Sequence, residues 1–115
     1  MTLPQIAFAL FAAVAMGGLV MTLMILVRVR LPAFLGPAHG LGGLAALLFL
    51  FGVNLHSGDA TPTTAWWALG VFFLGFVGGL LLFRVLFKEK APLSLAALHG
   101  SIGAVGLYLL YSSAF

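Results

Sequence analysis

Two histidines of this sequence stand in the same local setting, since each begins the string His-Gly-x-x-Gly, at positions 39–43 and 99–103. On a helix, the residues four and seven positions after each histidine share its face. These residues are all small: Gly43, Ala46, Gly103 and Gly106. Neutral imidazole is a good ligand for iron, and small residues leave room beside it for a flat macrocycle. The pattern therefore predicts an iron held between His39 and His99, a closed arrangement that is suited to electron transfer.

Four apolar stretches must position these side chains, and each is long enough to cross about 30 Å of hydrocarbon. They cover residues 3–27, 33–53, 64–87 and 92–112. Short connections make consecutive helices antiparallel neighbours. The sequence thus predicts an all-α membrane protein, an up-down bundle of four transmembrane helices that forms a single transmembrane domain over residues 1–115.

The second half of the chain repeats the first at an offset of 60 residues, so that His39 matches His99. We expect two tandem two-helix repeats, residues 1–55 and 61–115. Because each repeat has an even number of spans, the two are parallel and are related by a pseudo-twofold axis along the membrane normal. The two histidines must then lie at equal depth, on opposite sides of that axis.

The composition narrows the class of protein, because 63% of the 115 residues are hydrophobic and only five basic and two acidic residues are present. A soluble domain of this size carries about a quarter charged residues. The absence of cysteine excludes disulfides, iron–sulfur clusters and the Cys-x-x-Cys-His attachment of c-type haem. Two acids leave no paired carboxylates for hydrolysis, so an electron-transfer or accessory subunit is favoured over an enzyme.

The basic residues indicate the orientation, since all five follow the first and third spans. By the positive-inside rule, the short loops 28–32 and 88–91 are cytoplasmic and both termini face outward. The N-terminus lacks a basic region ahead of its apolar stretch, so the first span is expected to be retained. We therefore expect an integral protein of the inner (cytoplasmic) membrane. The net charge of +3 concerns this orientation, and no nucleic-acid partner is expected.

The two His-Gly-x-x-Gly strings, in the second and fourth spans, resemble helical b-type cytochromes. These proteins hold haem between histidines of two helices in a four-helix bundle, with glycines where the porphyrin packs. The resemblance is architectural, and it implies one non-covalent haem b with His39 and His99 as axial ligands. Arg84 lies within the last turn of the third span, and its guanidinium could snorkel to the interface or pair with a haem propionate.

A packing role for the same strings stays open, because glycine faces are the usual means by which membrane helices approach one another closely. A role of the two histidines in binding another ligand or in moving protons stays open as well. Gly75-x-x-x-Gly79 fits such a helix contact. The third span is also rich in aromatic residues, which we expect to face lipid or a partner: Phe72, Phe73, Phe76 and Phe83.

Three functions follow from these features. The first is a membrane cytochrome subunit that exchanges electrons with other redox subunits or with a quinone. The second is a cofactor-free accessory subunit of a larger membrane complex. The third is a small transporter or channel, for which a homo-oligomer is one option. It ranks last, because coupled transport usually needs an intramembrane carboxylate and the spans contain none.

Overall fold

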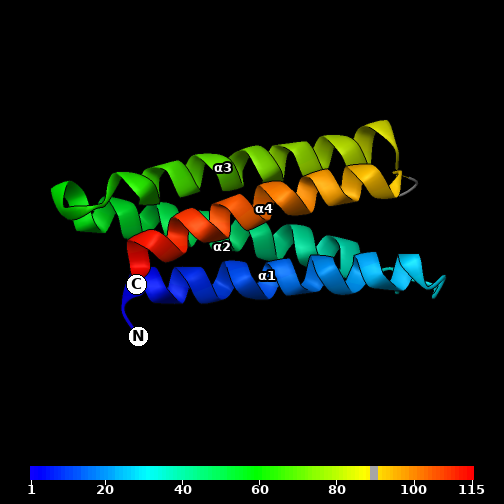
Figure 1. The fold of residues 1–115 in the computed structure, drawn as a ribbon, viewed down its shortest axis with the longest axis horizontal. Coiled ribbons are helices and arrows are strands. Elements are labelled where there is room, and N and C mark those ends of the chain that lie inside the picture. Colours follow the sequence, from blue (N-terminus) through cyan, green and yellow to red (C-terminus); the bar gives the residue numbers. More distant parts are fainter. Residues whose placement is uncertain (89–90) are drawn as a thin grey trace.

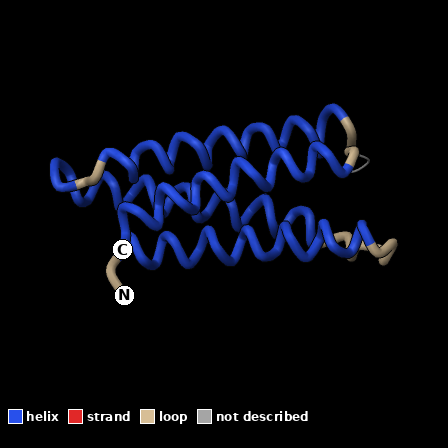
Figure 2. The backbone as a smooth tube through the Cα atoms, viewed as in Figure 1, coloured by secondary structure: helices blue, strands red, loops and turns tan. Residues whose placement is uncertain are grey.

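The computed structural model describes residues 1–88 and 91–115, which form four long helices joined by short connections (Figures 1 and 2). The helices are α1 (Leu3–Leu26), α2 (Leu35–Ser57), α3 (Thr63–Leu80) and α4 (Leu93–Ala114). A short helix η1 (Gly58–Ala60) follows α2, and a π-helical turn η2 (Leu81–Leu86) continues α3. All four are long and apolar enough to cross a membrane. The predicted all-α, four-helix architecture is confirmed.

The helices form a closed ring of four in which consecutive helices run antiparallel (Figure 1). Both α1 and α3 pack against α2 and against α4, so α2 and α4 face each other across the diagonal of the bundle. The two chain termini lie side by side (Figure 1), and Gln5 Nε2 donates a hydrogen bond to the carbonyl of Ala114 at 3.3 Å. We call this the terminal end of the bundle. At the opposite end, residues 27–34 connect α1 to α2, η2 ends and α4 begins; we call it the basic end.

Local signals explain where the helices begin and end. The Thr2 hydroxyl caps α1 by accepting a hydrogen bond from the Gln5 N–H, and the Gln5 side chain accepts one from the Thr2 N–H, which forms a capping box. At the basic end, Arg28 has a φ of 60° and Lys88 has a φ of 44°. A left-handed residue ends a helix, and these two stand at equivalent positions of the predicted repeat. Glu89 and Lys90, which belong to the predicted basic loop 88–91, lie outside the described residues.

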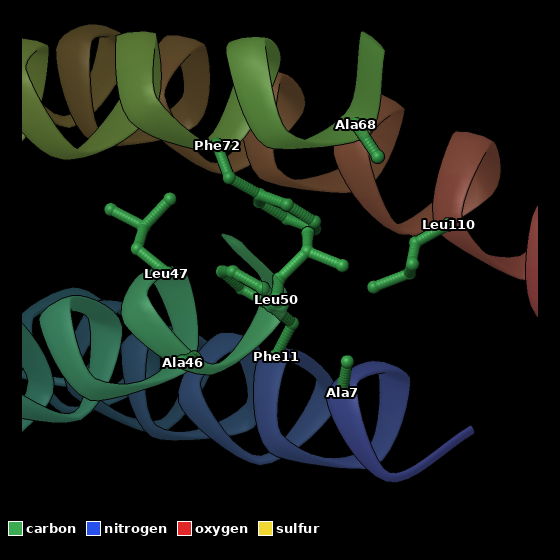
Figure 3. Packing of buried hydrophobic residues seen from close by; sticks show 8 residues of the cluster. All are labelled: Ala7, Phe11, Ala46, Leu47, Leu50, Ala68, Phe72 and Leu110. Carbon is green, nitrogen blue, oxygen red and sulfur yellow. The ribbon is translucent and has the colours of Figure 1, made fainter. Parts of the chain in front are cut away.

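The apolar core lies in the half of the bundle nearest the terminal end (Figure 3). Its buried members come from all four helices: Ala7, Phe11, Ala46, Leu47, Leu50, Ala68, Phe72 and Leu110. The rings of Phe11 and Phe72 stack with centroids 3.6 Å apart and planes 5° apart. A Cβ on Gly106 would lie 2.5 Å from the Phe72 ring. The absence of a side chain at this position therefore leaves room for that ring in the core.

The half of the bundle nearest the basic end is packed differently. Among the described residues, none of 12–45, 76–88 and 91–105 is buried. Glycine is frequent on these segments, and a Cβ on Gly40, Gly78, Gly100 or Gly103 would meet nothing within 4 Å. The helices of this half thus enclose less side-chain volume than those of the other half, and both histidines of the His-Gly-x-x-Gly strings belong to it.

Two sequence-based expectations need correction. Phe72 does not face lipid or a partner, because it is only 8% exposed and lies at the centre of the core, whereas Phe73 is 59% exposed. The second helix continues to Ser57 instead of ending at residue 53. It continues because Asn54, although polar, is 2% exposed and its Nδ2 donates to the carbonyl of Ala65 at 3.2 Å.

The buried Asn54 ties the end of α2 to the start of α3, and its removal should weaken that connection. We expect Asn54→Ala to lower the free energy of unfolding by about 1 kcal/mol, the net value of a typical hydrogen bond. The measurement is reversible unfolding in mixed detergent micelles, followed by circular dichroism. Leu55→Ala is the matched control, since the exposed Leu55 is the next residue. Equal stability of the two variants would contradict a structural role for the Asn54 amide.

Candidate functional site

His39 and His99 approach each other across the bundle. They come from α2 and α4, the diagonal pair of helices, and their ring centroids lie 6.1 Å apart with the ring planes at 71°. Both side chains are half-buried. His39 and His99 occupy equivalent positions of the predicted repeat, which predicts that they face each other across an axis. In the structure, the two rings lie close together.

Each imidazole rests against the helix that precedes its own in the sequence. A Cβ built on Gly18 of α1 would lie 2.9 Å from Cε1 of His39, and a Cβ built on Gly79 of α3 would lie 2.8 Å from Cε1 of His99. One turn before these glycines, the backbone at Val14 lies beside His39. The backbone at Gly75 likewise lies beside His99.

A neutral imidazole that donates one N–H to a carbonyl keeps its second nitrogen as an acceptor or metal ligand. In His39, Nδ1 is buried and has no hydrogen-bond partner within residues 1–88 and 91–115. A buried nitrogen without a partner calls for an explanation, such as a bound ion or a water molecule. This nitrogen is therefore able to accept a hydrogen bond from a water molecule or to bind a metal ion.

The separation of the rings is compatible with a shared metal. A metal–imidazole bond is about 2 Å long, and the ring centre lies roughly 1 Å behind the ligating nitrogen, so two imidazoles on opposite sides of one metal have centroids about 6 Å apart. The observed 6.1 Å agrees with that spacing. The two histidines are the only protein ligands at hand, because no group of three or more His, Cys, Asp or Glu side chains occurs among the described residues.

The small residues predicted to flank the histidines divide into two groups. Gly103 has open space over its Cα, and a Cβ on Gly43 would only touch Phe76 and Val14, at 3.8 and 3.9 Å. These two positions can border a flat group beside the imidazoles. Ala46 and Gly106 share the same helix faces but are buried in the apolar core. They therefore lie beneath the histidine pair as part of its support.

Arg84 reaches from one hairpin of the bundle to the other. It is exposed and belongs to the π-helical turn η2, and its Nη2 would be 3.3 Å from a Cβ on Gly36, in the first turn of α2. Gly36 precedes His39 by three residues, or about 4.5 Å along a helix axis. The guanidinium thus lies at the basic end, close to the level of the histidines.

Other neighbours of the pair were not identified from the sequence as site residues. Phe83, also in η2, meets the ring of His99 edge-on, with centroids 5.5 Å apart and an interplanar angle of 80°. Gly79 is the second glycine of the Gly75-x-x-x-Gly79 motif, which the sequence indicates as a helix contact. The ring of His99 packs against this part of α3. His56 is exposed in the last turn of α2, at the terminal end, and takes no part in the site.

A surface groove of about 400 Å³ lies between α2 and α3, away from the histidines, and its lining is apolar. It is bordered by residues such as Leu48, Phe51, Trp66 and Phe73. No polar group in this lining marks a reaction centre, so the histidine pair is the candidate functional site. No family model, no curated protein and no solved structure matches this chain.

Proposed function

We propose that this chain is a membrane-embedded electron-transfer subunit that holds one haem b, without covalent attachment, between His39 and His99. The observation that carries the proposal is the facing pair of imidazoles, 6.1 Å apart, in the half of the bundle that contains no buried residue among those described. The unpartnered Nδ1 of His39 adds support. When bound, haem supplies an iron that takes up and releases one electron.

Two protein ligands favour a macrocycle over a bare metal ion. Structural zinc takes four protein ligands, and catalytic zinc takes three with water, whereas a porphyrin supplies four nitrogens and leaves only two axial positions for the protein. If His39 and His99 both bound the iron of such a haem, no position would remain for another ligand. The residues of this chain therefore favour electron transfer over the binding of oxygen.

The remaining site residues have supporting roles in this proposal. Gly43 and Gly103 leave room for the porphyrin edge, and Ala46 and Gly106 fix the helices below it. Arg84, at the basic end, would be the residue to hold a propionate, because guanidinium and carboxylate form strong charge-assisted hydrogen bonds. The partners are the lipid bilayer and either neighbouring redox subunits or a quinone.

The wild-type protein tests the proposal directly. We expect a sharp α-band in the dithionite-reduced minus oxidised spectrum of the protein purified from native membranes, and one haem b per chain by pyridine haemochrome assay. A colourless protein, isolated with its native neighbours, would overturn the proposal. It would leave the cofactor-free accessory subunit, in which the histidines serve helix packing.

The orientation in the membrane is also a proposal, supported by the five basic residues that follow the first and third spans. The basic end then faces the cytoplasm, and both termini face outward in the inner membrane. Because the chain has no cysteine, single cysteines can report the orientation. We expect a membrane-impermeant maleimide to label Asp59→Cys in intact cells, and to label Val29→Cys only after permeabilisation. Both positions are exposed, and the reverse labelling pattern would contradict this orientation.

A further inference from the structure

The two imidazoles are held in the same way by helices that contribute no ligand. Each rests with Cε1 over a glycine of the preceding helix, Gly18 for His39 and Gly79 for His99. The backbone carbonyl one turn earlier, that of Val14 or Gly75, lies beside the same ring. A glycine under the ring and a carbonyl beside it together form what we call a seat.

Each seat depends on one glycine of a sequential pair, namely Gly18 of the pair 17–18 and Gly79 of the pair 78–79. In α1, a Cβ on Gly18 would lie 2.9 Å from the His39 ring, whereas a Cβ on Gly17 would come no closer than 3.9 Å. In α3, a Cβ on Gly79 would lie 2.8 Å from the His99 ring, whereas a Cβ on Gly78 would meet nothing within 4 Å. Contacts below 3.0 Å are essentially never seen for a real Cβ, and an imidazole is rigid, so the ring would have to move.

We propose that Gly18 and Gly79 are positioning residues, which set the rotation and height of the two imidazoles so that a nitrogen of each faces the iron. This inference rests on the proposed haem-binding function. The backbone at Val14 and at Gly75 lies beside the same two rings and borders each seat on the side one turn earlier.

The two seats differ in one neighbouring side chain. The same substitution should therefore disturb one histidine more than the other. Phe83 stands edge-on to His99, 5.5 Å away between centroids, whereas the residue 60 positions earlier is Leu23. Phe83 limits how far the His99 ring can shift along α3. A Cβ at position 79 should therefore disturb its ligand more than a Cβ at position 18 disturbs His39.

The experiment compares Gly18→Ala and Gly79→Ala with Gly17→Ala and Gly78→Ala in the full chain. In the haem-loaded protein we expect the first two variants to shift the low-spin electron paramagnetic resonance signal and the midpoint potential, Gly79→Ala more than Gly18→Ala, or to lose that signal altogether. In the apo chain labelled with ¹⁵N-histidine, Gly18→Ala should move the His39 resonances and Gly79→Ala those of His99, with His56 unchanged. Both control variants should match wild type.

The inference and the proposed function fail in different ways. If the wild-type protein binds haem but all four variants keep its signal and potential, the positioning role is wrong and the haem site stands. A fall in the helical content of the apo Gly18→Ala or Gly79→Ala chain also overturns the positioning role, because the glycine would then serve the fold. If the wild-type protein binds no haem, the proposed function itself fails, whatever the histidine resonances show.

Discussion

Replacement of His39 or of His99 by alanine is expected to abolish haem binding, with loss of the α-band from the reduced minus oxidised spectrum. Each histidine supplies one of two facing imidazoles, 6.1 Å apart, and no other His, Cys, Asp or Glu gathers with them among the described residues. Loss of a mere outer-shell partner of a metal ligand already costs about 10–100-fold in affinity. Loss of the ligand itself should leave no occupied protein at micromolar concentration.

A control variant and a rescue experiment test whether the loss of haem is specific to the two predicted ligands. His56→Ala is the matched control, because His56 is exposed in the last turn of α2, at the opposite end of the bundle; its spectrum should equal that of wild type. In His39→Gly and His99→Gly, added imidazole should restore the α-band, since a free imidazole can occupy the place of the missing ring. Full haem content in either alanine variant would show that the pair does not ligate iron.

Replacement of Phe72 by alanine is expected to cause the largest loss of stability, about 3 kcal/mol in the free energy of unfolding. Phe72 is 8% exposed, stacks on Phe11 at 3.6 Å and covers Gly106. In a membrane, lipid is as apolar as the core, so the loss reflects packing more than transfer from water. The measurement is reversible unfolding in mixed micelles, with the haem spectrum as a second readout that should not change.

Phe73→Ala is the control for this prediction, since Phe73 is the next residue and is 59% exposed. Its effect should stay within about 0.5 kcal/mol, as for most surface substitutions. Gly106→Ala should destabilise by about 1–3 kcal/mol through overpacking, and Phe72→Leu in the same chain should relieve part of that cost. Equal losses for Phe72→Ala and Phe73→Ala would mean that the aromatic core does not hold the bundle together.

The four long helices could be predicted from the sequence because each coincides with a long, continuous apolar stretch. The first was expected over residues 3–27 and forms Leu3–Leu26. The second helix extends beyond its predicted end because Asn54 finds a partner in Ala65, eleven residues away across a turn. The sequence shows that Asn54 is polar but does not show this contact. It therefore predicts that the second helix ends before Asn54.

The approach of His39 to His99 could be anticipated from their equal offset, but the surroundings of the two rings could not. Helical spacing placed Ala46 and Gly106 on the correct faces, yet it did not show that the Phe72 ring occupies the space at Gly106. The residues that touch the imidazoles depend on how neighbouring helices pack. Phe83 reaches His99 from a π-helical turn, and the pattern of apolar residues does not indicate where a helix widens.

The unequal packing of the two halves has a consequence for the biogenesis of this protein. All residues of the apolar core lie near the terminal end, where they join the four helices without any contribution from the histidines. The packing at this end alone can hold the two hairpins together. If the chain holds haem as proposed, the cofactor would load in a separate, later step at the opposite end, and its supply would not need to be synchronised with the synthesis of the chain.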